Sequence, residues 1–474
     1  MFDNETLASK TAIHRVSIIL YPFHHQSYSY LLFDSYFSSF FYEHGSTHNL
    51  ILIFIGFAYF IFFNLKKIDY HFKVISLFLL IYFVGILIYK SHDDFPYYHF
   101  QYTYYLTQMP SVIGIGNFNL GFRTPSSIFY LNSLFYLPII KFYMFQMAAF
   151  LIFLYSNVIL ISKLIKDNIN KKYNFLTFYY LLSFIFINIF FYRLSEYGTD
   201  RAAMILLFLF IIELLNFVNF KNIKTLNLFY IYLLGALIVS LKTFYILYII
   251  FIVPLFAYIL KNKKNYIQTS YFLFFNKYFI LFLLLFLFIL FTYYINTGCL
   301  VYPLRLTCFD GLSWGIPLAQ VQQMNDWYEL WSKGGAGPNF RIDNPATYIK
   351  NFNWISNWID IYFFNKVSDF ILGIILLISI FLFFFKKSFF KKTRIKVDHH
   401  VYLVYLLILI LGIEWFYNHP ALRYGGYHII ALLLFIPISV KLGSAQIDLK
   451  KYSKISIVLV SITIIIFLSR NISR

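Results

Sequence analysis

Two adjacent carboxylates, Asp93 and Asp94, are the strongest indication of chemistry in this sequence. They lie in the stretch His92-Asp-Asp-Phe-Pro-Tyr-Tyr-His99, just after an apolar run that ends near residue 89. Only 20 of the 474 residues are Asp or Glu, so an acidic pair between two histidines is unusual in this chain. Repulsion between the two groups is expected to raise the pKa of one carboxyl, which suits a general base or a metal ligand. The structural alternative is a turn or helix cap before Pro96.

Basic residues that could face these carboxylates also follow a pattern. Charge within or against an apolar run is costly and indicates function, and four residues are of this kind: Glu213, Lys242, Glu414 and Arg423. Arg binds phosphate through a bidentate fork, and six of the ten arginines fall in loops predicted to face outward. They are Arg123, Arg193, Arg201, Arg305, Arg341 and Arg423. This pattern fits an anionic substrate at the outer face as well as it fits plain ion pairs, such as Arg201 with Asp200 or Glu196.

The elements that carry these residues are predicted to be membrane-spanning helices. Hydrophobic residues make up 60% of the chain and charged residues 12%, and many apolar runs are long enough to cross a bilayer core of about 30 Å. The sequence therefore predicts an all-α polytopic transmembrane helix bundle of about 12 spans. Spans are expected near 50–65, 74–89, 143–161, 175–192, 202–219, 278–294, 368–385, 401–417, 427–440 and 455–469, with a pair in 227–260 turning near Lys242 and a re-entrant segment at 129–140.

Charge divides the connecting loops into two sets. Lysines gather near 66–67, 163–172, 221–224, 261–264, 386–396 and 441–454, and these loops are predicted to face the cytoplasm. The alternate loops, 90–128, 193–201, 295–366 and 418–426, balance acids against bases and are predicted to face outward. The net charge of +19 is therefore expected to set orientation in the bilayer rather than to bind nucleic acid.

This pattern divides the chain into four parts. Residues 1–48 are unassigned, 49–294 form an N-terminal transmembrane module with the catalytic loop 90–128, 295–366 form a long outer loop, and 367–474 form a C-terminal transmembrane module. In the long loop, Trp327/Trp331 and Trp354/Trp358 are spaced by four residues. That spacing predicts short helices in the outer interface, or alternatively a stacking wall for sugar rings. The glycine-rich segment 333–339 between the pairs is a candidate lid hinge or an ordinary loop.

The two cysteines and the absent motifs narrow the possibilities further. Cys299 and Cys308 fall in the same predicted outer loop, which favours a disulfide over two independent thiols. The sequence has no Walker loop, no Gly-x-Ser-x-Gly elbow and no Cys/His cluster with zinc spacing. ATP-driven transport by this chain is therefore not expected, and any metal ligands stay unknown.

Three stretches of the chain resemble known membrane proteins. They are His92 to His99, Phe122-Arg-Thr-Pro-Ser-Ser-Ile-Phe-Tyr-Leu-Asn-Ser-Leu-Phe-Tyr-Leu-Pro138, and His419-Pro-Ala-Leu-Arg-Tyr-Gly-Gly-Tyr427, which are similar to a group of uncharacterised bacterial membrane proteins. An early outer-loop carboxylate, many spans, outward-facing Arg and a long late outer loop also resemble the glycosyltransferase C superfamily. The acidic pair departs from that superfamily pattern, because at least one extra span precedes it.

The resemblance implies an enzyme of the bacterial plasma (inner) membrane that moves a sugar from a polyprenyl-phosphate carrier to a lipid or glycan acceptor of the cell envelope, on the outer face. It implies Asp93 or Asp94 as general base. The implied substrate-binding residues are Lys242, Arg201 and Arg423 on the phosphate, with Arg123, His92 and His99 nearby. A divalent metal ion is the one cofactor left open.

Two other functions compete with glycosyl transfer. A surface-polysaccharide polymerase of the O-antigen type would rely mainly on Arg and tolerate loss of Asp93 and Asp94. A non-enzymatic flippase or transporter of lipid-linked sugars would need charged residues along a pathway through both leaflets. The polar residues of this chain concentrate on one side, which argues against the transporter.

Overall fold

All elements of secondary structure in the described part of the chain are helical. The computed structural model describes residues 35–64, 70–87, 92–171, 173–219, 225–337, 341–389, 397–444 and 449–473. The predicted basic loops at 66–67 and 221–224, most of 386–396, most of residues 1–48 and the end of the 333–339 segment lie outside them. For the described residues, the prediction of an all-α fold is confirmed.

The helices follow one another with short connections. Before residue 220 they are α2 (Ser46–Asn64), α3 (Tyr70–Phe83), α4 (Phe100–Leu106), α5 (Ser127–Ser133), α6 (Met147–Ile169), α7 (Phe175–Phe190) and α8 (Asp200–Asn219). After it they are α9 (Thr225–Leu241), α10 (Ile252–Lys263), α11 (Tyr266–Phe274), α12 (Lys277–Thr297), α13 (Leu318–Lys333), α14 (Pro345–Tyr348), α15 (Ile355–Trp358), α16 (Ser368–Phe389), α17 (His399–Asn418), α18 (Gly426–Gly443) and α19 (Leu449–Ile472). Short 3-10 or π segments include η3 (Phe95–His99), η7 (Leu194–Glu196), η8 (Thr243–Phe251), η10 (Ile359–Val367) and η11 (Leu422–Tyr424).

Eight helical stretches in the described residues are long and apolar enough to cross a membrane. They are Phe142–Ile169, Asp200–Asn219, Thr243–Lys263, Lys277–Thr297, Ile355–Lys386, His399–Asn418, Gly426–Gly443 and Lys450–Ile472. Four shorter apolar helices lie at Ser46–Ala58, Val74–Ile86, Phe175–Phe190 and Thr225–Leu241. The chain is therefore a multi-pass membrane protein by helix content, and the total of about 12 spans stays a prediction.

The apolar stretch 227–260 breaks at Lys242, where the sequence predicts a turn. Helix α9 ends at Leu241, Lys242 has extended backbone with φ −151° and ψ 109°, and η8 begins at Thr243. The predicted re-entrant segment begins as α5, a seven-residue helix whose residues are all buried. Both interruptions place polar backbone and side chains at the same end of the bundle, because the hydroxyl of Ser126 donates to the carbonyl of Leu241 at 2.7 Å.

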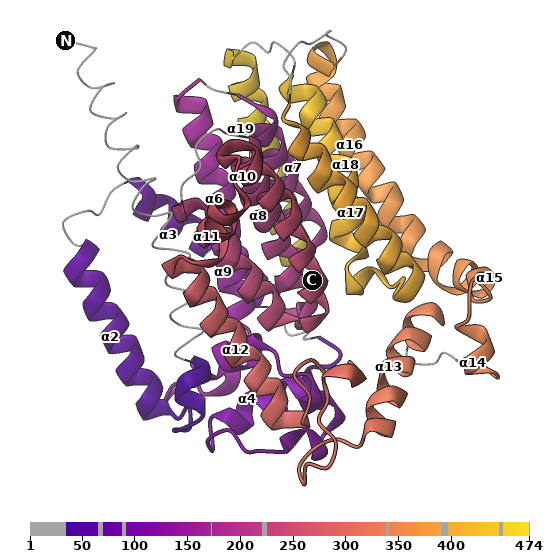
Figure 1. Cartoon of the computed structure of the whole chain (residues 1–474). Helices are drawn as coiled ribbons and strands as arrows, with labels where there is room; N and C mark the ends of the chain where they lie inside the picture. Colours follow the sequence, from indigo (N-terminus) through magenta and orange to yellow (C-terminus); the bar gives the residue numbers. More distant parts are fainter. Residues whose placement is uncertain are drawn as a thin grey trace.

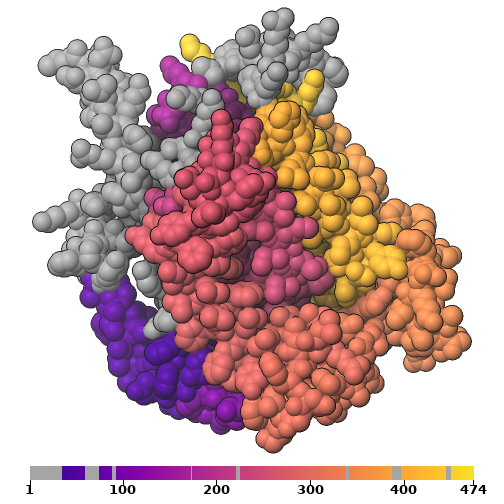
Figure 2. All heavy atoms as spheres, viewed as in Figure 1, coloured from indigo at the N-terminus to yellow at the C-terminus, as the bar shows by residue number. Residues whose placement is uncertain are grey.

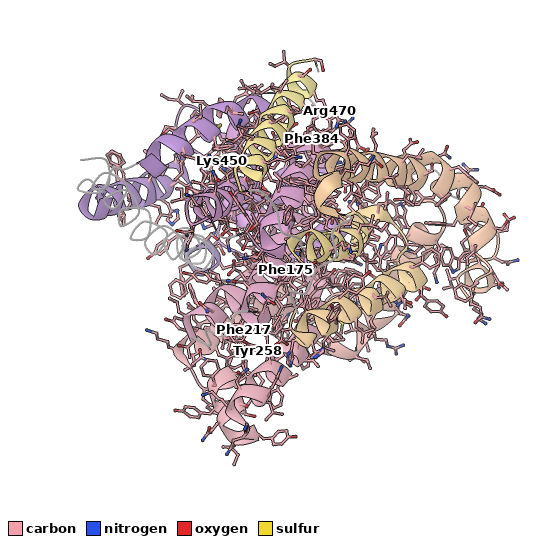
Figure 3. All side chains as sticks on the ribbon, turned by 90° about the horizontal axis from the view of Figure 1, so that it is seen from above. Phe175, Phe217, Tyr258, Phe384, Lys450 and Arg470 are labelled. Atoms are coloured by element: carbon pink, nitrogen blue, oxygen red, sulfur yellow. A yellow bond between two sulfur atoms is a disulfide. The ribbon has the colours of Figure 1, made fainter. Side chains whose placement is uncertain are left out.

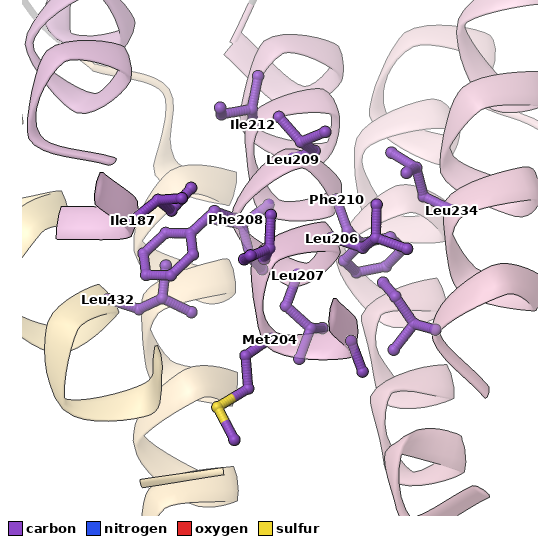
Figure 4. Packing of buried hydrophobic residues seen from close by; sticks show 14 of the residues in the cluster. Ile187, Met204, Leu206, Leu207, Phe208, Leu209, Phe210, Ile212, Leu234 and Leu432 are labelled. Carbon is purple, nitrogen blue, oxygen red and sulfur yellow. The ribbon is translucent and has the colours of Figure 1, made fainter. Parts of the chain in front are cut away.

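The core of the bundle is built around α8, which is apolar on all sides apart from its two ends and Glu213. In Figure 4, Phe208 lies toward Ile187 of α7 and Leu432 of α18, while Leu206 and Phe210 lie toward Leu234 of α9. A helix that is apolar all round is stable only when other helices cover it, so α8 takes the central place. Seen from above, Phe175 lies near the middle of the molecule, whereas Lys450 and Arg470 lie on the more peripheral α19 (Figure 3).

One end of the bundle gathers four connecting segments, which we call the loop end: residues 92–126, 193–199, 298–354 and 419–425. It is the lower end in Figure 1, where α4 and α13 lie, and residues near 300–340 cover much of it in Figure 2. The amide of Asn117 donates to the carbonyl of Trp314 at 2.7 Å, which joins the first long loop to the last. The two loops predicted to share a side therefore do so. That this side faces outward stays a prediction.

The long loop 295–366 differs in one respect from the predicted interfacial helices. Trp327 and Trp331 lie on one face of α13, as their spacing predicts, with ring centroids 6.3 Å apart. Trp354 and Trp358, in contrast, are buried and pack against Phe416. The second tryptophan pair therefore anchors the loop to α17 from inside the protein rather than facing lipid.

A disulfide bond joins Cys299 and Cys308, as predicted. The bond closes a hairpin directly after α12, and no cysteine is left free. Arg123 ties this region to the first loop, because its guanidinium donates to the hydroxyl of Tyr302 at 3.4 Å and to the side-chain oxygen of Gln320 at 3.2 Å. The loop end is thus cross-linked by covalent and polar contacts.

Candidate functional site

Asp200, the first residue of α8, lies at the centre of an ion-pair network at the loop end. Its Oδ1 accepts from Nζ of Lys242 at 2.8 Å, and its Oδ2 accepts from Nε of Arg423 at 3.0 Å. The carboxylate is 4% exposed, and a buried charge of this kind persists only when it is paired. The N-terminus of α8 adds a favourable dipole. Asp200 therefore fixes the two cations, which come from the break after α9 and from η11.

Asp94 joins this network through Arg423. Nη2 of Arg423 donates to Oδ2 of Asp94 at 3.2 Å, and both side chains are about one-third exposed. The backbone of Asp94 precedes η3, with its carbonyl accepting from the amide of Tyr98 at 3.2 Å, and Pro96 lies in the first turn of that segment. The predicted helix cap and the predicted functional position therefore coincide in one residue.

The electrostatics of Asp94 differ from the sequence prediction. Burial raises the pKa of Asp94, but the charges of Arg423 and His92 lower it by more, so the pKa lies below its usual value. The predicted increase from repulsion within the pair does not occur at Asp94. Asp93 is exposed, and in the described structure it makes no hydrogen bond or ion pair with the cations. Asp94 is therefore ionised at neutral pH and is the member of the pair that faces the site.

Aromatic side chains cover the network on the side of α13. The guanidinium of Arg423 lies 5.4 Å from the ring centroid of Trp331, and Nζ of Lys242 lies 5.5 Å from that of Tyr424. The rings of Trp331 and Tyr424 contact each other at 5.5 Å. Cation–π contacts of this kind hold a charge over a ring face. Trp327, 43% exposed, extends this aromatic cover to the surface beside the network.

Arg201 follows Asp200 on α8 but does not pair with it. Its Nη1 is buried and has no hydrogen-bond partner among the described residues. Glu196, its other predicted partner, instead accepts from Arg193 at 3.3 Å. Arg201 is close enough to influence His92 electrostatically. The site therefore contains a guanidinium whose charge the protein does not pair, as an anion-binding site requires.

Three predicted residues lie close to Asp94 or apart from it in distinct ways. Arg123 lies apart from the network, and its guanidinium donates to three protein groups, which assigns it a structural role. His92 lies beside Asp94, with its Nδ1 accepting from the Asp94 amide at 3.0 Å. His99 is buried behind them, with its ring centroid 5.3 Å from that of His92.

Both histidines are neutral at physiological pH. Burial lowers the pKa of His99 to about 3. Burial, with a further contribution from Arg423, also lowers the pKa of His92. One nitrogen, Asp94 and these two rings are the only described group whose geometry could hold a metal ion, since one ligand atom from each lies within 4.8 Å of the others.

Residues 30–430 match the model of a protein family described as "Domain of unknown function (DUF8201)". The chain belongs to this family. The match includes every member of the network from His92 to Arg423 and ends within α18. The description of the DUF8201 family assigns no activity and no substrate. No curated protein and no solved structure matches the chain.

In this DUF8201 chain, the site also contains residues that the sequence did not single out. Asp200 is the most important, and its signal was its position as the only acid at the start of a long apolar helix. Tyr424 and Tyr98 could not be found by type, because the chain has 43 tyrosines. Only the fold distinguishes the tyrosines near Arg423 from the others.

Proposed function

We propose that this protein transfers a sugar from a polyprenyl-phosphate carrier to a cell-envelope acceptor on the outer face of the bacterial plasma membrane. The observation that supports this most directly is the network Asp94–Arg423–Asp200–Lys242. It places a partly exposed, ionised carboxylate beside two cations at one end of a membrane helix bundle. A donor with its phosphate at the membrane surface and its prenyl tail in the bilayer would meet both kinds of group there.

The charge balance of the site supports an anionic ligand. Three cations, Lys242, Arg423 and Arg201, lie around two carboxylates, Asp94 and Asp200, and Arg201 has no acidic partner in the described residues. One negative group is therefore needed to balance the charge. A phosphate placed between Arg201 and Arg423 supplies it and accepts the paired hydrogen bonds that guanidinium groups favour.

The reaction follows from these positions. The acceptor hydroxyl attacks the anomeric carbon of the donor sugar, and the bond between that carbon and the phosphate oxygen breaks. The proton of the hydroxyl goes to Asp94, and the electron pair of the broken bond stays on the polyprenyl phosphate. Arg423, Lys242 and Arg201 stabilise the negative charge that develops on the leaving phosphate. We assign the aromatic cover of α13 the task of shielding the reacting groups from water and binding sugar rings at Trp327.

Deletion of the gene in its native host tests the proposal. We expect the host to accumulate a polyprenyl-phosphate-linked sugar, seen by mass spectrometry of lipid extracts, and to lose that sugar from an envelope glycan. Complementation with Asp94→Asn should lower transfer by about 100-fold or more, the usual contribution of a general base. Asp93→Asn is the matched control, because it removes a neighbouring exposed carboxylate and should retain near-normal transfer.

Two results would redirect the assignment. An unchanged pool of lipid-linked sugars and an unchanged envelope in the deletion strain would rule out glycosyl transfer. If the deletion changes the glycan chain length and Asp94→Asn restores it fully, then the polymerase alternative, which relies on Arg423 and Arg201, becomes the better explanation. The level of each variant in the membrane must be matched by immunoblot before transfer is compared.

A further inference from the structure

His99 presents a buried nitrogen with nothing to bind. The residue is 6% exposed, and its Nε2 has no hydrogen-bond partner among the described residues. Buried polar atoms are almost always paired, so an orphaned one needs an explanation. The ring contacts around it are apolar or aromatic, from Tyr98 at 4.4 Å and Phe129 at 5.2 Å, and they hold the ring in one orientation.

A small cavity adjoins the histidines. It measures about 30 Å³ and is lined by His92, His99, Thr103, Asn132, Ser195 and Gly198, among others. A polar cavity of this size has room for an ion or for one or two water molecules. It is too small for a sugar, so it does not belong to the substrate-binding region of the proposed function. Its wall is rigid at Gly198, where a Cβ would lie 3.0 Å from the ring of His92.

We propose that His92, Asp94 and His99 bind a divalent transition-metal ion of the zinc class. Ligand atoms of the three residues lie within 4.8 Å of one another. Two imidazoles and one carboxylate are a set that zinc and its neighbours favour, whereas calcium and magnesium favour oxygen ligands alone. The fourth coordination position is then filled by water or by a ligand that enters from outside.

The geometry also defines what must change on binding. Tetrahedral zinc places its donors roughly 3.3 Å apart, so the segment from His92 to His99 contracts slightly around the ion. Nδ1 of His92 now accepts from the Asp94 amide, and an ion bound at that nitrogen replaces this hydrogen bond. Arg423 already holds Oδ2 of Asp94, which leaves Oδ1 for the metal and orients the carboxylate.

The ion and the acceptor hydroxyl compete for the same carboxylate. This consequence rests on the proposed function, in which Asp94 takes the proton, whereas the binding site itself does not depend on it. Zinc is therefore expected to inhibit transfer, and a chelator is expected to restore it. A protein that needs zinc for transfer would keep the metal site but refute the assignment of Asp94 as a free base.

Metal binding to the purified, tag-free full chain in detergent tests the site. After treatment with a chelator, we expect one Zn²⁺ per chain by calorimetry, and Co²⁺ should give the absorption bands of a four-coordinate ion with nitrogen and oxygen ligands. His92→Gln, His99→Gln and Asp94→Asn should each weaken binding at least tenfold. His399→Gln, an exposed histidine at the opposite end of the bundle, should leave binding unchanged.

Defined outcomes overturn the site. No stoichiometric binding of either metal refutes it, as does binding that His92→Gln and Asp94→Asn both leave intact. Because His99 is buried, folding of His99→Gln is checked by thermal unfolding, and the two partly exposed ligands carry the test if that variant is unstable. Loss of binding with normal transfer in the untreated protein separates failure of the metal site from failure of the proposed function.

Discussion

Arg423 bridges Asp94 and Asp200 with two different nitrogens. Its Nη2 lies 3.2 Å from Oδ2 of Asp94, and its Nε lies 3.0 Å from Oδ2 of Asp200. The bridge joins a loop between the first helices to the start of α8, and it comes itself from η11 near the C-terminus. One side chain therefore determines how three distant segments meet at the site.

Replacing Arg423 with Lys should not preserve the site. A lysine has one compact charge and cannot hold two carboxylates in the fixed fork of a guanidinium. We expect Arg423→Lys and Arg423→Gln to lower transfer similarly, each by more than tenfold. Arg305→Gln, which removes an exposed loop-end arginine, should have little effect. Near-normal transfer by Arg423→Lys would show that only the charge matters and that the bridge does not.

Lys242 and Asp200 should show strong coupling in a double-mutant cycle. Removing one member of a buried pair leaves the other charge uncompensated, which typically costs about 3–5 kcal/mol. We expect Asp200→Asn to destabilise the protein strongly and Lys242→Gln to do so less, because Lys242 is partly exposed and Arg423 still pairs with Asp200. The double variant should cost less than the sum, measured by thermal unfolding in detergent. Additive effects would mean that the two residues do not interact.

The helical fold was predictable from the sequence because apolar runs record burial in lipid directly. The break at Lys242 was also predictable, since a run of that length exceeds one span and contains a single charge. The disulfide followed from two cysteines in one predicted outer loop. In each case, a local feature of the sequence was sufficient.

The partners of each charge were not predictable, because they depend on packing between distant segments. Arg201 is adjacent to Asp200 in sequence, yet successive residues on a helix point in different directions, so Asp200 pairs with Lys242 and Arg423 instead. Likewise, the sequence treats Asp93 and Asp94 alike, and only the fold exposes one and pairs the other. Trp354 and Trp358 illustrate the same limit, since helical spacing does not reveal which side of a helix faces lipid.

Labelling of single cysteines should establish which side of the membrane carries the site. The native cysteines are bonded, so new thiols can be introduced at exposed positions without removing them. We expect an impermeant maleimide to label Val112→Cys and Lys350→Cys in intact cells, because both positions lie at the loop end. Asn170→Cys, in the lysine-rich loop at the opposite end, should react only after lysis. The reverse pattern would place the site in the cytoplasm and remove the reason for a polyprenyl-linked donor.

The contribution of Asp94 to stability should depend on pH in a defined direction. The pKa of Asp94 is lowered in the folded protein, whereas an unfolded Asp titrates near pH 3.9. A lowered folded-state pKa means that the ion pair with Arg423 contributes its full stabilisation above the unfolded pKa and loses it as the pH falls toward the folded one. We therefore expect the difference in melting temperature between the wild type and Asp94→Asn, measured with a chelator present, to be constant from about pH 7 to pH 5. It should shrink below about pH 4. The acid limb of transfer should likewise lie below about pH 4, because Asp94 must be ionised to accept a proton. A limb near pH 6 would point to a different base, and a difference in melting temperature that grows on acidification would contradict the ion pair.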